Sequence, residues 1–221
     1  MRPRLQRFWI AFRRNWGAIA GSLVVLMLVA LALLAPVLAP EDPFAMSVEA
    51  IMAPPSSDHW FGTDQYGRDI LSRTLYGARL SLQTGLVAVA IAATTGSLLG
   101  LAAGYYGGIT DSGIMRVVDV LLAFPGMLLA MAIVAVLGPS LINVMIAVGI
   151  GATPTYARVV RSSVLSAKEM PYVLAARSIG SSNARLMFGH ILPNTLSPII
   201  ILSSLSIASA ILAASGLSFI G

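Results

Sequence analysis

The residue types that most often do chemistry are scarce in this chain of 221 residues. It has no cysteine, which excludes disulfides, thiolate metal sites and thiol catalysis. With only two histidines, His59 and His190, a histidine-based metal cage is not expected. The single lysine, Lys168, follows Ser166 and Ala167 rather than a glycine-rich turn, so the sequence contains no phosphate-binding loop. We therefore expect no catalytic residue, no metal and no cofactor.

Asp119 lies one turn inside a long apolar stretch, where a carboxylate is costly and marks a partner or an aqueous path. Arg116 precedes it by three residues on the same helical face, so we predict a structural ion pair between the two rather than proton transfer. An ion-coupled secondary transporter needs coupling groups at mid-membrane, and only Asp119 is available for that role. An intramembrane enzyme needs paired carboxylates, a histidine pair or an activated nucleophile, and the sequence offers no such set.

The composition is typical of a membrane protein. Hydrophobic residues make up 57% of the chain and charged residues only 10%, against about 25% in soluble domains. A water-soluble fold of this length could not bury so much apolar surface. The formal charge of +5 does not indicate nucleic-acid binding, because most cations lie beside apolar runs, where they set membrane orientation.

Five stretches are predicted to span the membrane, since a crossing needs about 20 mostly apolar residues. They cover approximately residues 17–38, 80–105, 114–137, 141–156 and 196–213. We expect helices, because a chain in lipid must satisfy its own backbone hydrogen bonds. The first stretch is too long for a signal peptide, and Pro40 obstructs its best cleavage site, so we expect an uncleaved anchor. The predicted fold class is an all-α integral membrane bundle.

The basic residues predict a cytoplasmic N-terminus, with an outer loop at 39–79 and a cytoplasmic loop at 157–193. Eleven of the fourteen Lys and Arg residues then lie on or beside the inner side, namely Arg2, Arg4, Arg7, Arg13, Arg14, Arg116, Arg158, Arg161, Lys168, Arg177 and Arg185. The others, Arg68, Arg73 and Arg79, lie in the outer loop. We divide the chain into residues 1–79, with the tail, the first span and the outer loop, and a core at 80–221.

Two features predict how the helices pack. Gly96, Gly100 and Gly104 repeat at a spacing of four, so they share one face of the second span and allow close backbone approach. We prefer general helix packing for this face over direct substrate contact. Pro125 removes a backbone donor inside the third span and predicts a kink there.

The outer loop combines a proline-rich first part with an amphipathic segment. From Ile70 to Ala78, apolar residues fall on one helical face. Asp69 and Arg73 are spaced for an i,i+4 ion pair. The spacing favours an interfacial helix before the second span, and the alternative is a docking surface for an external partner.

The cytoplasmic loop is too polar to span and carries clear helix signals. Pro171 suits the first turn of a helix over 172–179, which Gly180 ends. Ser181 or Ser182 can cap a second helix that runs toward the next span.

We expect Pro193 to stop this second helix near the last span. On the first helix, Ala175 and Ala176 leave a small-residue surface where another protein could press close. Spacing alone leaves two interpretations of the loop equally open, a docking site for a partner and a folded connector.

This loop resembles the "EAA" loop of ABC importer permeases, whose pattern is Glu-Ala-Ala, three residues, Gly, nine residues and Ile-x-Leu-Pro. The likeness begins at Tyr172, and the residues in register are Ala175, Ala176, Gly180, Leu192 and Pro193. Leu174 stands in place of the glutamate and His190 in place of the first isoleucine. The resemblance implies that loss of the glutamate removes one polar contact with the ATPase but does not prevent docking itself.

A second likeness extends over nearly the whole chain. The outer loop is similar to the signature of C-type permeases for dipeptides, oligopeptides and nickel, through Gly62, Thr63, Asp64, Gly67, Arg68, Asp69 and Arg73. The basic residues before a first span ending at Pro40 also resemble that subfamily, as do Arg116, Asp119 and Pro125. Several motifs in order, on the expected sides of the membrane, are more specific than one short motif.

The resemblance implies a permease subunit of a type I ATP-binding-cassette importer in the bacterial cytoplasmic membrane. The family mechanism implies a second related permease, two cytoplasmic ATPase subunits and an extracytoplasmic solute-binding protein. Because the ATPase subunits hydrolyse ATP, the chain itself is not expected to be an enzyme, and no nucleic-acid partner is expected. Peptides are the first-choice substrate, while nickel, glutathione and opine- or sugar-like solutes remain open.

These permeases normally have six spans, and the sequence shows five. It stops at Gly221, where relatives continue outside and return through a sixth helix. We therefore expect a truncated sequence.

Overall fold

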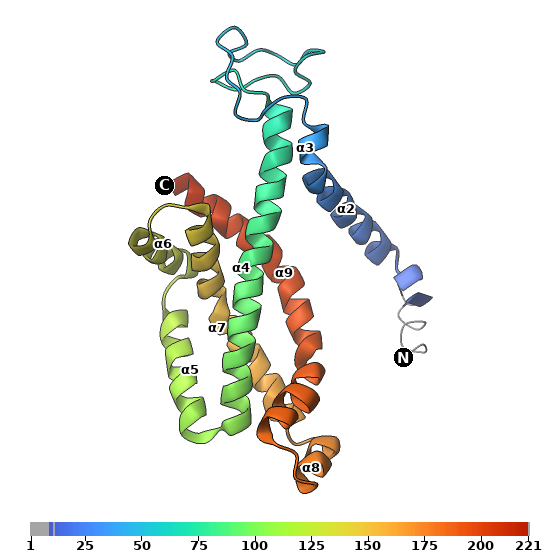
Figure 1. The fold of residues 1–221 in the computed structure, drawn as a ribbon, viewed down its shortest axis with the longest axis vertical. Coiled ribbons are helices and arrows are strands. Elements are labelled where there is room, and N and C mark those ends of the chain that lie inside the picture. The colour runs from blue at the N-terminus through green and yellow to red at the C-terminus, as the bar shows by residue number, and fades with distance from the viewer. Residues whose placement is uncertain (1–8, 11, 221) are drawn as a thin grey trace. The chain divides into compact units, whose positions relative to one another are not determined.

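The computed structural model describes residues 9–10 and 12–220, and its regular structure is almost entirely helical (Figure 1). The helices are α2 (Trp16–Leu33), α3 (Ala35–Leu38), α4 (Ile70–Tyr106), α5 (Gly108–Ala123), α6 (Gly126–Leu137), α7 (Leu141–Ala167), α8 (Pro171–Ser178), the π-helical segment η1 (Arg185–Ile191) and α9 (Leu192–Ile220). The predicted all-α class is therefore confirmed. Of the predicted basic N-terminal residues, Arg2, Arg4 and Arg7 lie outside the described residues.

The chain forms two compact units, Met1–Leu82 and Gln83–Gly221. In the first unit, the Asn15 side chain caps α2 by accepting a hydrogen bond from the Ala18 N–H at 3.2 Å. Leu34 separates α2 from α3, because Pro36 lies in the first turn of α3 and has no N–H to continue the α2 hydrogen bonds. The predicted first span therefore consists of two helices rather than one.

α4 joins two elements that the sequence predicted separately. It runs without a break through 37 residues, so it is roughly 55 Å long at 1.5 Å per residue. The predicted interfacial helix at 70–78 is the beginning of this helix, and its separate existence is a wrong prediction. No proline lies between Ile70 and Tyr106 to end the helix where the apolar span begins.

The predicted third span is broken rather than kinked. Phe124 is extended, with φ −85° and ψ 136°, because the ring of Pro125 disfavours a helical residue before it. α5 and α6 therefore meet at an angle of 95°. α5 also begins at Gly108 instead of Ile114, so it includes most of residues 106–113, which the prediction left between two spans.

α7 begins where predicted and ends much later. Ser140 accepts a hydrogen bond from the Asn143 N–H at 3.1 Å and caps the helix after a turn at Gly138, where φ is +91°. The helix then continues to Ala167, whereas the prediction ended it at Tyr156. Much of the predicted cytoplasmic loop is therefore helical and belongs to the bundle.

The second predicted inner helix does not stop at Pro193. It continues from η1 directly into α9. Within this junction the Leu192 N–H donates to the Met187 carbonyl, five residues earlier, as in a π-helix. Such a local widening accommodates the hydrogen bond that Pro193 cannot donate, which explains why the helix passes through the proline. The coupling segment, which we define as residues 171–191, is therefore continuous with the last helix.

The predicted glycine face packs against α7. A Cβ atom at Gly96 would lie 2.4 Å from the Tyr156 Cβ, and one at Gly100 would lie 2.5 Å from the Ala157 carbonyl oxygen. A Cβ atom at Gly104 would lie 2.9 Å from the Val164 Cβ. The prediction of close backbone approach is confirmed, and the neighbouring helix is α7.

The number of apolar spans is smaller than predicted. By length and composition, three helices of the described chain can cross a membrane, namely α2, α4 and the segment Arg185–Phe219. The bent pair of α5 and α6 adds a fourth if it is counted as one broken span. α7 has 27 residues, but Asn143, Thr153 and Arg158 interrupt its apolar sequence. The predicted total of five is therefore too high by this criterion.

Candidate coupling site and outer loop

The first helix of the coupling segment, α8, has one buried and one exposed face. Val173 is fully buried and Ala176 is 7% exposed, so both pack inside their own unit. Tyr172 and Leu174 are 43% and 41% exposed, and Ala175 is also on the surface. The predicted small-residue surface is therefore half wrong, because Ala176 is not accessible. The exposed face consists of Tyr172, Leu174 and Ala175.

Gly180 ends α8 in the predicted manner. Its φ of +82° is in the left-handed region, where glycine has no steric penalty. The Gly180 N–H donates to the Arg177 carbonyl at 3.0 Å, and the Ser181 N–H donates to the Ala176 carbonyl at 3.1 Å. These two bonds form a Schellman motif, which fixes the turn between α8 and the next helix.

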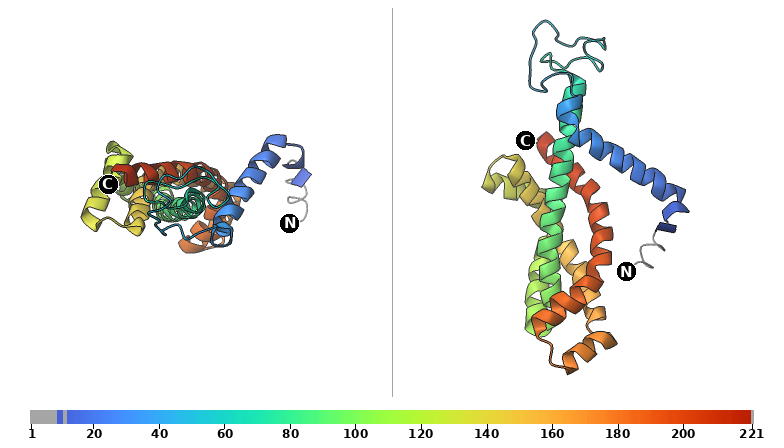
Figure 2. Two further views of the ribbon diagram at one scale, coloured as in Figure 1. Left: turned by 90° about the horizontal axis from the view of Figure 1, so that it is seen from above. Right: turned by 45° about the vertical axis from the view of Figure 1, so that its right-hand side comes forward.

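Three contacts attach the coupling segment and the end of α7 to the end of α4. The Tyr105 hydroxyl donates to Asn183 Oδ1 at 2.7 Å, and the Arg177 guanidinium lies 5.9 Å from the centre of the Tyr105 ring. Lys168 Nζ donates to the Gly104 carbonyl at 3.0 Å. In Figure 1 and in the right view of Figure 2, α8 lies at the end of the unit where α4 meets α5. The coupling segment is therefore fixed to the bundle.

The motif residues at the far end of the loop lie at the start of α9. Leu192 is partly buried against the main apolar cluster, while Pro193 is exposed. Ile191 and Leu186, in η1, are almost fully buried in the same cluster. A displacement of α8 and η1 would therefore be transmitted to α9 through packed side chains.

The ion pairs at this end of the bundle differ from the predicted pair. Asp119 on α5 accepts a hydrogen bond from Arg158 Nη2 on α7 at 2.6 Å, and no ion pair with Arg116 occurs among the described residues. A second pair joins the same helices, because Arg161 donates from Nε and Nη2 to the two carboxylate oxygens of Asp111, each at 2.5 Å. The prediction of Arg116 as the partner of Asp119 is wrong.

Asp64 organises the outer loop in the first unit. Its carboxylate accepts hydrogen bonds from the Tyr66 N–H at 2.8 Å and from the Arg68 N–H at 3.1 Å. The Arg68 side chain adds contacts from Nε and Nη2, both at 2.8 Å, and Arg73 Nε lies 3.5 Å away. The Arg68 guanidinium, with the two backbone N–H groups, lowers the pKa of Asp64 from 3.8 to about 2.

Asp69 holds the start of α4 and is completely buried. Burial alone raises its pKa, but the Ser72 N–H at 2.7 Å and the His59 ring at 3.3 Å outweigh burial, so the pKa of Asp69 is lowered. The predicted i,i+4 pair with Arg73 is absent among the described residues, because Arg73 is directed toward Asp64. His59 Nδ1 also lies 3.8 Å from a Glu41 carboxylate oxygen.

Gly62, Thr63 and Gly67 allow backbone segments of the outer loop to pack closely against one another. Gly62 and Gly67 have φ values of +72° and +70°. A Cβ atom at Gly67 would lie 1.8 Å from the Ser47 carbonyl oxygen, which no side chain could tolerate. Thr63 is buried, donates from its hydroxyl to the Ala50 carbonyl, and forms an antiparallel bridge with Asp69. The outer-loop signature thus builds the loop itself.

Sequence reasoning missed several residues at the inner end of the bundle. Arg158, Arg161 and Asp111 were assigned to loops, although the helices extend to include them. The three-residue spacing of Arg158 and Arg161 places them on one helical face. This spacing was the sequence pattern from which a continued helix could have been predicted. The described residues contain no group of three or more His, Asp or Glu side chains that could hold a metal.

Comparison with known proteins identifies the family. Residues 96–221 match the family described as "binding-protein-dependent transport system inner membrane component", and residues 4–55 match the N-terminal transmembrane domain of oligopeptide transport permease C. A crystal structure of an amino acid ABC transporter with histidines is 18% identical, with a TM-score of 0.50, over 69% of this chain and 77% of that one. That likeness supports the fold alone.

Several curated relatives are much closer in sequence. The dipeptide transport system permease protein DppC of Alkalihalophilus pseudofirmus is 46% identical, over 95% of this chain and 69% of its own length. DppC of Pseudomonas aeruginosa, named for di- and tripeptides, is 45% identical over 98% and 74%, and the glutathione permease GsiD of Pectobacterium atrosepticum is 43% identical over 100% and 74%. The chain is a multi-pass membrane protein and belongs to the family of binding-protein-dependent transport system inner membrane components.

Proposed function

We propose that this chain is one permease subunit of an ATP-binding-cassette importer that carries di- or oligopeptides into the cell. The observation that carries the proposal is the coupling segment, which is packed on one side, exposed on the other and continuous with α9. A connector without a partner has no need for an apolar exposed face such as Tyr172 and Leu174. The likeness of this segment to the EAA loop supports an ATPase subunit as the partner of that face.

Two ATPase subunits bind the coupling segments of this chain and of a second, related permease. On this chain they contact Tyr172, Leu174 and Ala175, all exposed on α8. Leu174 replaces the usual glutamate, so this position contributes apolar rather than ionic contact. The contact is consequently less sensitive to salt than an ion pair would be.

Closure of the ATPase subunits on nucleotide moves α8, and the bundle follows as packed helices. The hydrogen bonds from Tyr105 to Asn183 and from Lys168 to the Gly104 carbonyl carry the displacement to α4. The direct continuation of η1 carries it to α9. This chain therefore supplies the mechanical link and not the hydrolysis of ATP.

An extracytoplasmic binding protein delivers the substrate to the outer loop. Trp60, Phe61 and Tyr66 are 67%, 56% and 50% exposed there, on a loop held together by Asp64 and Asp69. Exposed aromatic residues on a rigid loop are typical of protein interfaces.

Peptides are the proposed substrates because the permeases of Alkalihalophilus pseudofirmus and Pseudomonas aeruginosa, at 46% and 45% identity, are named for dipeptides and for di- and tripeptides. Glutathione, which the GsiD relatives are named for, is the less favoured solute. Uptake of labelled dialanine, glutathione and nickel by a deletion strain, with and without the restored gene, distinguishes these solutes. Restoration of glutathione or nickel uptake alone would contradict the peptide assignment.

An ion-coupled secondary transporter is the rival function. It would use Asp119, but that carboxylate already accepts a hydrogen bond from Arg158 at 2.6 Å. Peptide uptake by membrane vesicles that needs ATP and survives collapse of ion gradients excludes the rival. Uptake driven by an imposed ion gradient without ATP would support it.

Cysteine crosslinking tests the proposed ATPase contact, and the natural absence of cysteine makes each new thiol unique in this chain. Leu174→Cys and Ala175→Cys should crosslink to an ATPase subunit with a yield that depends on nucleotide. Ala176→Cys is the matched control, since this neighbouring residue is only 7% exposed and should crosslink poorly. Absence of any crosslink from either exposed position rejects the proposed docking face.

The proposed orientation places the coupling segment in the cytoplasm and the outer loop outside. A reporter fused near residue 50 should therefore respond as external, and a reporter near residue 180 as cytoplasmic. The reverse pattern would invalidate both the ATPase and the binding-protein contacts.

A further inference from the structure

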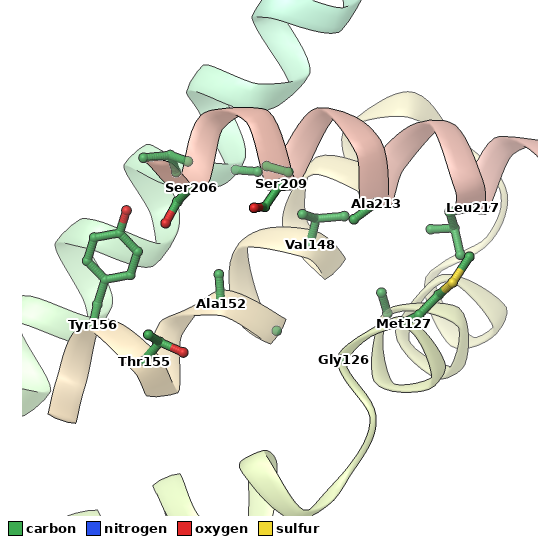
Figure 3. Close-up of a pocket in the computed structure, with 15 residues that line it drawn as sticks. Gly126, Met127, Val148, Ala152, Thr155, Tyr156, Ser206, Ser209, Ala213 and Leu217 are labelled. Atoms are coloured by element: carbon green, nitrogen blue, oxygen red, sulfur yellow. The ribbon is translucent and has the colours of Figure 1, made fainter. Parts of the chain in front are cut away.

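A cavity of about 320 Å³ lies within the second unit, between α4, α6, α7 and α9 (Figure 3). This volume is in the range of small-molecule sites, about 300–1,000 Å³. Its walls are mainly small apolar side chains, such as Ala152, Ala213 and Val148. None of the described residues that line it carries a charge.

Hydroxyl groups on two helices face this cavity. Ser206 and Ser209 are on the side of α9 that faces α7, opposite Thr155 (Figure 3). Within the described chain, no hydrogen bond involves these three hydroxyls. By contrast, Ser204 and Ser215, on other faces of α9, donate to the carbonyls four residues earlier at 2.7 and 2.9 Å. The cavity hydroxyls are therefore available to a ligand.

A purely apolar occupant fits these hydroxyls poorly. Covering a hydroxyl without a hydrogen bond costs about 1–3 kcal/mol, so a lipid chain or an apolar helix from the second permease would be penalised at Ser206, Ser209 and Thr155. A charged group would find no counter-ion in the lining, because none of the described residues that line the cavity carries a charge. The chemistry selects a neutral polar ligand.

We propose that this cavity is a transient binding site for the uncharged backbone of a peptide in transit, with Ser206, Ser209 and Thr155 as its polar contacts. This assignment rests on the proposed peptide-importer function and deepens it. A hydroxyl both donates and accepts hydrogen bonds, so it pairs with either half of an amide group. Contacts to the peptide backbone alone do not depend on the side chains of the peptide. Their small number keeps the peptide bound weakly enough to be released.

The position of the cavity couples it to the transport cycle. Gly126 and Met127, at its edge, begin α6 directly after the break at Pro125, where α5 and α6 meet at 95°. On the other side, the Tyr156 hydroxyl hydrogen-bonds Ser203 on α9 at 3.2 Å. A change in the angle between α5 and α6, or a displacement of α9 against α7, alters the width of the cavity. Weak binding at such a position permits alternating access.

Uptake of trialanine into membrane vesicles tests the proposal. The vesicles contain the assembled transporter, with its partner subunits and binding protein. Ser209→Leu fills the cavity from an exposed residue, so it should lower ATP-dependent uptake by about tenfold or more while the ATPase subunits still co-purify. Ser204→Leu, a matched exposed serine on α9 outside the lining, should stay within about twofold of wild type. The double variant Ser206→Ala, Ser209→Ala should raise the trialanine concentration needed for half-maximal uptake.

Thiol labelling gives a second readout that does not depend on the rate of uptake. Ser209→Cys is the only thiol of the chain, and turnover with trialanine should slow its reaction with a small polar methanethiosulfonate. Ser204→Cys should label at the same rate with and without the peptide. Equal labelling of Ser209→Cys under both conditions overturns the proposed site.

The outcomes separate this proposal from the function on which it rests. Wild-type vesicles that take up no trialanine overturn the peptide-importer function and the peptide occupant together. Wild-type uptake with Ser209→Leu as active as Ser204→Leu overturns the cavity site alone. Loss of the second permease from the complex in Ser209→Leu, with normal turnover in what remains assembled, assigns the cavity to a partner helix and also overturns it.

Discussion

Arg161 on α7 donates two parallel hydrogen bonds to Asp111 on α5, from Nε to Oδ1 and from Nη2 to Oδ2, each at 2.5 Å. The geometry is bidentate, which is the strongest arrangement of an arginine and a carboxylate. Asp111 is 17% exposed and Arg161 34%, so water screens the pair only partly. Together with the pair of Asp119 and Arg158, it links α5 and α7.

We predict from this relationship that a double-mutant cycle of Asp111→Asn and Arg161→Gln gives a coupling energy of about 1–2 kcal/mol in unfolding of the detergent-solubilised chain. The same cycle at Asp119 and Arg158, which are 59% and 55% exposed, should give less than about 1 kcal/mol. Arg116→Gln is the control and should not couple to Asp119. Coupling of Arg116 instead of Arg158 to Asp119 would contradict the observed pairing.

The glycine face of α4 gives a second prediction. Gly100→Ala should destabilise the chain by about 1–3 kcal/mol, because the new Cβ would lie 2.5 Å from the Ala157 carbonyl and 2.9 Å from the Arg161 backbone nitrogen. Gly113→Ala in α5 is the matched control, since nothing lies within 4 Å of its Cβ position and alanine favours a helix. Thermal unfolding of both variants measures the difference. Equal stabilities would show that α4 and α7 can separate without cost.

Local signals predicted these features well. The spacing of the three glycines and the glycine at the end of α8 each act within one or two turns, so neighbouring sequence contains the information. The apolar stretches likewise located every long helix, because helices in lipid need continuous apolar sequence.

Predictions failed where distant residues decide the structure. α7 continues to Ala167 because Val160 and Val164 are fully buried, a tertiary effect that outweighs the charges beside them. The partner of Asp119 lies 39 residues away, so spacing along one helix selected the wrong arginine. Neither of these effects is visible in local sequence patterns.

The turn of the coupling segment supports a third prediction. Gly180→Ala should destabilise the left-handed turn by about 1–2 kcal/mol and lower ATP-dependent uptake, since an L-residue is strained at a φ of +82°. Gly180→Asn should lose less stability and less uptake than Gly180→Ala, because asparagine tolerates this conformation. Gly189→Ala in η1 is the control, because its nearest neighbour to a new Cβ is 3.9 Å away and its backbone is helical. Equal loss in all three variants would point to a general folding defect.

Acid should loosen the outer loop through Asp64. Its pKa of about 2 in the folded chain is below the ordinary 3.8, so the ionised carboxylate stabilises the loop above about pH 4. This contribution declines as the pH falls and is lost once the pH passes below about 2. The fluorescence of Trp60, in a chain with Trp9→Phe and Trp16→Phe, should report a transition in this window.

Asp64→Asn should abolish this acid transition and leave the loop loosened at neutral pH, because a neutral amide cannot hold Arg68 as the carboxylate does. Asp58→Asn is the matched control, since its carboxylate contacts only the Ser57 hydroxyl, at 3.4 Å, among the described residues. It should keep the transition of the parent chain. A transition that persists in Asp64→Asn, or that disappears in Asp58→Asn, would assign the acid sensitivity to another carboxylate, of which the buried Asp69 is the next to test.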